Sequence, residues 1–344
     1  PCPNICFFFC GQGPQQAGMG LSLATSEPVF AKHLETCDEL IQQYAGWSLL
    51  EELARGAGDS RLKETAIAQP ALTALQTGLV ALLKSWNLEA NTVVGHSVGE
   101  IAAMQSAGLL SLDEAIRIAC HRGEIMQAAD GTGAMASLML DSVATAEAIA
   151  PFGTALSIAA INSPGETVIS GETVALDTLL EKLKAQGIGQ HRLPVRYAFH
   201  SDQMSPFETR LIKTLGAVTS HPANSVRAIS TVTGEPVTQV DAAHFARGIR
   251  APVLFAKAMQ ATATDERTVY IEIGPHPVLS ASIAASMEKA GISDRPIVPT
   301  LRRGRADREV MVECAAKLYE AGHSPRWSAL IPSGGRIVSL PTHP

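Results

Sequence analysis

Short, largely apolar segments recur along the chain and predict buried β-strands, since strands covered on both faces lack a polar side. These strand candidates lie at residues 5–10, 92–94, 227–232 and 269–273. Segments with helical periodicity separate them, at residues 28–54, 69–86, 101–107, 111–129, 206–215 and 252–263. Strands that alternate with helices indicate an α/β body built on a parallel sheet.

Residues 131–196 interrupt this body with another order of elements. Strand patterns at 135–140, 155–162, 166–170 and 188–195 alternate with helical patterns at 143–150 and 173–186. This βαββαβ order is that of the ferredoxin-like fold. We therefore expect a ferredoxin-like subdomain at 131–196, inserted into an α/β body of residues 1–130 and 197–296. From residue 297 the chain turns basic and irregular, and we expect 297–344, which ends in LPTHP, to form a wrapping linker.

Composition and charge narrow the class of protein. The chain has 344 residues, of which 46% are hydrophobic and 17% charged, so a large core is readily supplied. A net charge of −6 without a basic block argues against nucleic acid as a partner. No apolar run reaches the roughly 18 residues that span a bilayer, and no signal peptide is recognisable. We expect no membrane contact.

The six cysteines lack metal-ligand spacing, so we expect free thiols, no bound metal and a reducing cytoplasmic location. The chain opens without an initiator Met, directly on its first predicted strand. We therefore expect that it is part of a longer protein.

A candidate nucleophile lies between the second predicted strand and the helix that follows. Residues 95–99 read GHSVG, which fits the G-x-S-x-G nucleophile elbow, with Ser97 at its centre. The hydroxyl of Ser97 would project at a helix N-terminus, where the helix dipole favours developing negative charge. The alternative is a glycine-rich turn that merely reverses the chain.

A nucleophilic serine needs a general base, and the chain offers ten histidines. His200 follows the inserted subdomain at its return to the body, where a cleft between domains would lie. His276, after the strand at 269–273, is the rival candidate. We expect His96 to be structural, because adjacent residues in a sharp turn point apart.

Arg122 stands out by helical phase. On the helix that starts near residue 111, it shares a face with apolar side chains, those of Ala115, Ile118, Ile125 and Met126. An inward guanidinium needs an anion, since an unpaired buried charge is very unfavourable. The partner is either a structural Asp or Glu, or the carboxylate of a substrate held by two hydrogen bonds.

Together these motifs resemble the malonyl-CoA:acyl carrier protein transacylases. The resemblance runs from residue 5 to about residue 290 and rests on six segments in the family's order: Gly11-Gln12-Gly13, GHSVGE at 95–100, RGEIMQ at 122–127, NSPGETVISG at 162–171, YAFHS at 197–201 and IEIGPHPVL at 271–279. The tail from LRRG at 301–304 is similar to the linker that follows acyltransferase domains of modular polyketide synthases.

This resemblance implies an α/β-hydrolase-like body with a ferredoxin-like insertion, and a role for each matched residue. Ser97 would be the nucleophile and His200 the general base. The backbone N–H groups of Gln12 and Val98 would form the oxyanion hole. Arg122 would hold the free carboxylate of a malonyl-type extender unit.

The chain departs from the family's pattern at one position. Gly248 stands where the family usually has the Asn or Gln that helps to orient the catalytic histidine. A backbone carbonyl or Asn162, which lies in the NSP segment near the active site, would then orient His200.

The acyl group is expected to be malonyl. Val98 resembles malonyl-selective domains, and the bulky Phe199 would crowd an α-methyl group. Tyr197 is shared with the methylmalonyl pattern, so methylmalonyl or an alkoxymalonyl unit is the alternative.

The resemblance implies an acyltransferase that serves polyketide biosynthesis, which includes the biosynthesis of antibiotics. The enzyme would follow ping-pong kinetics and bind no cofactor of its own. Malonyl-CoA would be the donor, and an acyl carrier protein would supply the phosphopantetheine thiol. The neighbouring ketosynthase and other synthase domains are further expected partners. An acyl hydrolase with the same serine and a catalytically silent docking domain are the competing hypotheses.

Overall fold

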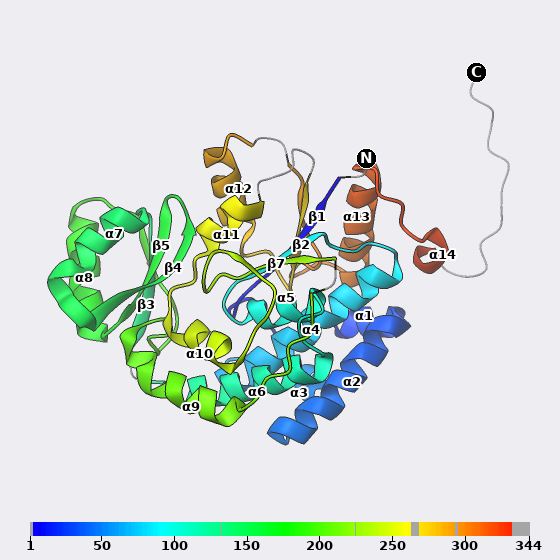
Figure 1. Ribbon diagram of the computed structural model, residues 1–344, viewed down its shortest axis with the longest axis horizontal. Helices are drawn as coiled ribbons and strands as arrows, with labels where there is room; N and C mark the ends of the chain where they lie inside the picture. The colour runs from blue at the N-terminus through cyan, green and yellow to red at the C-terminus, as the bar shows by residue number, and fades with distance from the viewer. Residues whose placement is uncertain (1–2, 132, 224, 263–267, 293–294, 332–344) are drawn as a thin grey trace.

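A six-stranded sheet forms the centre of the larger body (Figure 1). The structure is a computed structural model that describes residues 3–131, 133–223, 225–262, 268–292 and 295–331. The strand order is β10-β9-β1-β2-β7-β8, and each pairing is parallel except that of β8 with β7. Their bounds are β1 Ile5–Phe9, β2 Thr92–Gly95, β7 Arg227–Ile229, β8 Pro236–Val237, β9 Val269–Ile273 and β10 Ile297–Pro299. Every residue of β1 and β9 is buried, as expected for strands covered on both faces, and this includes Glu272 of β9.

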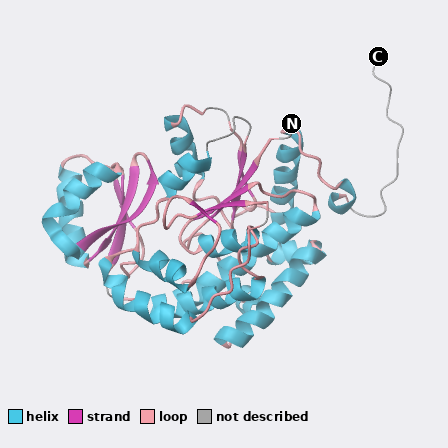
Figure 2. Ribbon diagram, viewed as in Figure 1, coloured by secondary structure: helices cyan, strands magenta, loops and turns pink. Residues whose placement is uncertain are grey.

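Helices pack around this sheet (Figure 2). Those before the inserted subdomain are α1 Leu21–Ser26, α2 Pro28–Ala45, α3 Leu49–Ala54, α4 Thr65–Ser85, α5 Gly99–Ser106 and α6 Leu112–Gln127. Those after it are α9 Ser205–Leu215, α10 Ala242–Arg250, α11 Phe255–Thr262, α12 Ser280–Lys289, α13 Asp307–Glu320 and α14 Trp327–Leu330. Helix α6 packs along α4 and α2, and these contacts hold Arg122 on the inner side of the bundle.

Helix α4 corrects one expectation. It is long and apolar enough to cross a membrane by length and composition alone, although the sequence analysis found no such run. Yet 83% of its apolar window is buried inside the protein, so the helix is a central element of the core.

The inserted subdomain is a separate layer at the left of Figure 1. Its elements are β3 Ala134–Leu138, α7 Ser142–Ile149, β4 Leu156–Ser163, β5 Glu166–Gly171, α8 Thr173–Ala185 and β6 Gln190–Arg192. They form an antiparallel sheet in the order β4-β5-β3-β6, with its own apolar core beneath α7 and α8. The predicted fold class, an α/β body with a βαββαβ insertion, is confirmed.

Two segments differ from the sequence-based expectation. The helix expected at 252–263 begins at Phe255. Helix α10, which was not expected, precedes it and ends at Arg250, because Pro252 disfavours helical geometry at Ala251. Residues 297–299, expected to begin the linker, form β10 at the edge of the body sheet, beside β9. The final LPTHP segment lies outside the described residues, and the domain boundaries stay predictions.

Candidate active site

The segment around Ser97 forms a strained turn between β2 and α5. Ser97 has φ 53°, a left-handed conformation that a non-glycine residue rarely adopts. A Cβ at Gly95 would lie 2.3 Å from the backbone of Glu100, and one at Gly99 would lie 2.3 Å from the carbonyl oxygen of Phe9. Both positions therefore require glycine, as the G-x-S-x-G interpretation predicts.

His200 is the histidine that lies beside Ser97. The Nε2 atom of His200 is 2.9 Å from Ser97 Oγ, and its Nδ1 is 2.9 Å from the carbonyl oxygen of Ala251. A carbonyl can only accept, so Nδ1 carries the hydrogen and neutral His200 turns its Nε2 lone pair toward Ser97. The backbone N–H of His200 also donates to the Ile249 carbonyl at 3.0 Å, which anchors a residue with φ 57°.

Electrostatics keep His200 neutral. Burial, followed by the positive charge of Arg122, lowers the pKa of His200 from 6.5 to about 3, although the hydrogen bond to Ala251 opposes this shift. A neutral imidazole at pH 7 is the form that can accept a proton from Ser97.

The guanidinium of Arg122 is buried beside Ser97, with 2% of the residue exposed. Its NH1 donates to Gln69 Oε1 at 2.7 Å, and its NH2 lies 3.2 Å from Ser97 Oγ and 3.3 Å from the Gly248 carbonyl oxygen. These partners are all neutral, and within the described ranges no carboxylate forms an ion pair with Arg122. Burial lowers the pKa of Arg122 to about 10, partly opposed by the negative charge of Glu100. The guanidinium thus remains charged among neutral protein partners.

The loop that contains Gln12 lies against the elbow. A Cβ at Gly11 would be 3.0 Å from the carbonyl oxygen of His96 and 3.7 Å from the Cβ of Ser97. In the described part of the chain, the backbone N–H groups of Gln12 and Val98 donate no hydrogen bond to another residue. Two free donors near Ser97 fit an oxyanion hole.

Tyr197 and Phe199 form a stacked aromatic pair. Their ring centroids are 3.6 Å apart and their planes are inclined by 13°. The side-chain amide of Gln12 lies 3.4 Å from the Tyr197 hydroxyl, which connects the pair to the loop beside Ser97. Burial, aided by the charge of Asp130, raises the pKa of Tyr197 to about 12, so its hydroxyl stays protonated.

The remaining candidates have other partners. His96 Nε2 is 2.9 Å from Asn162 Oδ1, and the His96 ring packs against Phe255, in keeping with a structural role. Asn162 therefore contacts His96 and not His200. His276 Nδ1 accepts from the backbone N–H of Arg303 at 3.3 Å, whereas the histidine that hydrogen-bonds Ser97 is His200.

A backbone carbonyl, one of the two groups expected to orient His200, does so, and it is that of Ala251. Sequence reasoning missed which carbonyl this is, and it missed the other partners of the site: the side chain of Gln69 and the carbonyl groups of Gly248 and Ile249. Gln69 begins the apolar segment at 69–86, and a polar residue on that buried face was an available signal. A carbonyl group has no residue signature.

No group of three or more His, Cys, Asp or Glu side chains that could bind a metal occurs among the residues described. The five described cysteines are buried free thiols, namely Cys6, Cys10, Cys37, Cys120 and Cys314.

Comparison with known proteins relates the whole chain to one family. The acyl transferase domain family matches residues 6–325. Polyketide synthase GfsA of Streptomyces halstedii is 39% identical over 352 residues, which cover 99% of this chain and 5% of that protein. Erythronolide synthase EryA2 of Saccharopolyspora erythraea is 36% identical over 344 residues, covering 99% of this chain and 10% of that protein. The chain thus spans a tenth or less of the length of these two relatives.

Solved structures extend the likeness to the fold. The acyltransferase domain from module 8 of the salinomycin polyketide synthase has a TM-score of 0.90 and 31% identity, covering 95% of this chain and 77% of that one. The domain from the second module of the same synthase has a TM-score of 0.89 and 32% identity, covering 99% and 79%.

Proposed function

Because the chain belongs to the acyl transferase domain family of the polyketide synthase type, we propose that it transfers malonyl from coenzyme A to an acyl carrier protein through an ester on Ser97. The observation that carries this proposal is the position of Arg122. Its buried guanidinium has neutral partners and lies 3.2 Å from the Oγ atom of Ser97. A donor with a free carboxylate would supply the missing counter-charge and bring its thioester to the nucleophile.

In the acylation step, His200 Nε2 accepts the proton of Ser97 Oγ as that oxygen attacks the thioester carbonyl carbon. The carbonyl oxygen becomes an oxyanion, which the backbone N–H groups of Gln12 and Val98 stabilise. The C–S bond then breaks, and the coenzyme A sulfur leaves with the proton from His200. The Ala251 carbonyl keeps the imidazole in the required tautomer throughout.

The second half-reaction repeats these steps with a different thiol. The phosphopantetheine thiol of the carrier protein gives its proton to His200 and attacks the Ser97 ester. Ser97 leaves with the proton, and the acyl group remains on the carrier as a thioester. The scheme is ping-pong covalent catalysis. The neighbouring ketosynthase would use the loaded carrier in a cytoplasmic synthase.

Malonyl is the favoured acyl group because the bulky ring of Phe199 is buried, with 6% exposed, and stacks on Tyr197. A ring in this position would crowd an α-methyl substituent. One methyl group is worth about 1–3 kcal/mol of discrimination in an apolar pocket, so methylmalonyl or an alkoxymalonyl unit is the alternative donor.

An acyl hydrolase would share the Ser97–His200 pair but would pass the acyl group to water. One experiment separates these functions: the protein is mixed with radiolabelled malonyl-CoA and a phosphopantetheinylated carrier protein. We expect label first on the protein and then on the carrier. Label that appears chiefly as free malonate would support the hydrolase, and no labelled protein or product would support a silent domain.

The matched control for this assay is Ser97→Ala. The variant should keep the fold and lose the covalent adduct, because the alanine side chain has no nucleophile. Intact-mass spectra that still show a malonyl adduct on the variant would refute Ser97 as the acylated residue.

A further inference from the structure

A buried carboxylate lies immediately behind the nucleophile elbow. Glu100, in the first turn of α5, accepts at Oε1 from Ser230 Oγ at 2.5 Å and His244 Nε2 at 2.7 Å, and at Oε2 from the backbone N–H of Thr231 at 2.9 Å. The Thr231 hydroxyl lies 2.7 Å from both Oε2 and the Gly95 carbonyl oxygen, and these two acceptors share its single hydrogen. Its side chain is 4% exposed. The proposed transfer mechanism does not use this carboxylate.

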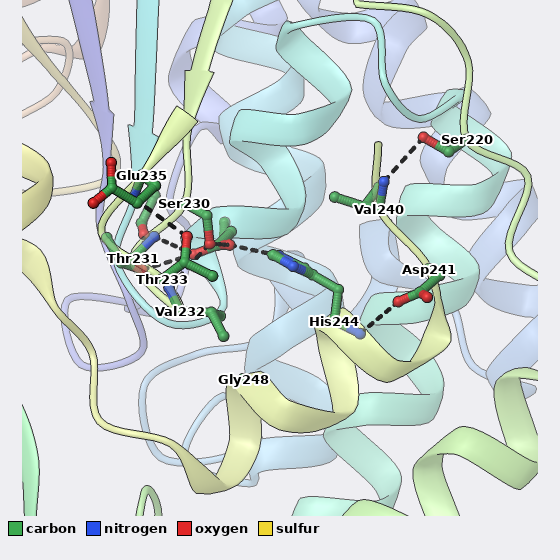
Figure 3. Close-up of polar contacts among 12 residues, drawn as sticks. Ser220, Ser230, Thr231, Val232, Thr233, Glu235, Val240, Asp241, His244 and Gly248 are labelled. Carbon is green, nitrogen blue, oxygen red and sulfur yellow. Dashed lines mark hydrogen bonds and ion pairs between the residues drawn. The ribbon is translucent and has the colours of Figure 1, made fainter. Parts of the chain in front are cut away.

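His244 joins this carboxylate to helix α10. It lies in the first turn of the helix, where its backbone N–H donates to the N-cap carboxylate of Asp241 at 2.7 Å (Figure 3). Its ring points the other way, toward the end of β7 where Ser230 and Thr231 lie (Figure 3). Because an ionised carboxylate can only accept, His244 Nε2 carries the hydrogen of the bond to Glu100.

The other end of the same helix carries the carbonyl groups that orient the reacting side chains. Gly248 accepts from Arg122, and Ile249 and Ala251 accept from His200. Gly248 has no side chain that could orient His200, so the position of the backbone at this end of α10 decides where the carbonyl groups meet Arg122 and His200. His244 and Ala251 are seven residues apart along about two turns of helix, roughly 10 Å.

We propose that Glu100 and His244 form a positioning pair that locks α10 against the nucleophile elbow and thereby sets the orientation of His200 and Arg122. Neither residue touches the reacting atoms. The inference rests on the proposed function for its kinetic consequences, whereas the contacts themselves do not depend on the identity of the donor.

The charges of the site are consistent with this pair. Burial alone would raise the pKa of Glu100, but the hydrogen bond and charge of His244, with the hydroxyls of Ser230 and Thr231, hold it below its ordinary value. The carboxylate is therefore ionised, and its charge also favours the charged form of Arg122. The pair thus both fixes the position of α10 beside the site and stabilises the charge of Arg122.

The test compares two amide variants that differ in side-chain length, His244→Gln and His244→Asn. The amide nitrogen of Gln can reach the place of Nε2, whereas Asn is one methylene shorter and cannot reach Glu100. Two rates are measured on each: acylation by saturating malonyl-CoA, and sulfonylation of Ser97 by phenylmethanesulfonyl fluoride, which needs no thioester. Displacement of a catalytic group by about 1 Å can cost roughly 100-fold in rate.

We expect His244→Asn to lose about 10- to 100-fold in both rates and to show a lower malonyl-to-acetyl ratio, because His200 and Arg122 shift together. His244→Gln should keep most of each rate. His244→Leu is the second variant, with the loss expected of Asn, should the Asn variant fold poorly.

The matched control is Asp241→Ala, which removes the N-cap of the same helix and leaves the Glu100–His244 contact. It should lower the melting temperature with both rates near wild type. Equal rates in the Asn and Gln variants, or the same rate loss in Asp241→Ala, would overturn the positioning role. If malonyl-CoA did not acylate the wild-type protein, the proposed function alone would be refuted, since the sulfonylation rates would still test the Glu100–His244 pair.

Discussion

Replacing Arg122 with alanine separates the substrate-binding role of this residue from a structural one. The guanidinium donates to Gln69, Ser97 and Gly248, and none of these partners is charged. If Arg122 formed a structural ion pair, its replacement would leave a protein carboxylate without a partner. If Arg122 binds the substrate, its replacement would instead leave the carboxylate of the donor without a partner.

The magnitude follows from the burial of the charge. The pKa of Arg122 falls from 12.5 to about 10, which corresponds to a cost of about 3 kcal/mol for keeping the charge in the folded protein. Its removal relieves this cost and offsets much of the loss of packing, so the melting temperature should change by a few degrees at most. Two charge-assisted hydrogen bonds to a carboxylate contribute about 3 kcal/mol or more, or about 100-fold in rate.

The assay measures acylation of Arg122→Ala by malonyl-CoA and acetyl-CoA in direct competition. We expect the malonyl-to-acetyl ratio to fall by about 100-fold. Arg122→Lys should recover little, because an ammonium lacks the planar fork of the guanidinium. Arg117→Ala is the matched control on the same helix, since Arg117 pairs with Glu114 at 2.8 Å, and it should leave the ratio unchanged.

Melting temperature and ratio are measured on the same preparation of each variant. A strongly lowered melting temperature with an unchanged ratio in Arg122→Ala would show that the residue is a structural cation. The assignment of the carboxylate-binding site would then be wrong.

Three further predictions concern His200, the acyl pocket and pH. His200→Ala should slow acylation by roughly 100- to 10,000-fold, the range of a lost general base; a larger loss in His276→Ala would identify the other histidine as the base. Phe199→Ser should raise methylmalonyl transfer relative to malonyl by about tenfold at most, and an unchanged ratio in direct competition would locate the pocket wall elsewhere. Burial lowers the pKa of His33 to about 4 and that of His200 to about 3, and it also lowers the pKa of His96. The unfolded chain therefore binds more protons in acid, so stability present above pH 6.5 should decline as the pH falls toward 4. A melting temperature that stays constant from pH 7 to 4.5 would contradict this.

Much of the site could be read from local patterns. The elbow at Ser97 is specified within five residues, because its strained backbone requires glycine at positions 95 and 99. The inward position of Arg122 follows from helical periodicity, and its burial confirms that expectation. The βαββαβ order likewise predicts the inserted sheet, since hydrophobic period and turn residues are properties of short segments.

The orientation of these groups depends on contacts between segments far apart in the chain. His200 meets the carbonyl of Ala251, Arg122 meets Gln69, and Glu100 meets His244, which are separated by 51, 53 and 144 residues. A backbone carbonyl is common to every residue, so no sequence pattern distinguishes Ala251 from its neighbours.

The sequence by itself therefore determined which side chains are the candidates for the chemistry, since a serine elbow, a histidine and an inward cation are recognised by residue type and local geometry. The tertiary structure alone decided what holds them. Because Gly248 has no side chain, the carbonyl group of Ala251 orients His200, and neutral groups surround Arg122. The physical reason is that the desolvation and alignment of a charged or basic group depend on all the segments packed around it, and packing is set by the whole fold.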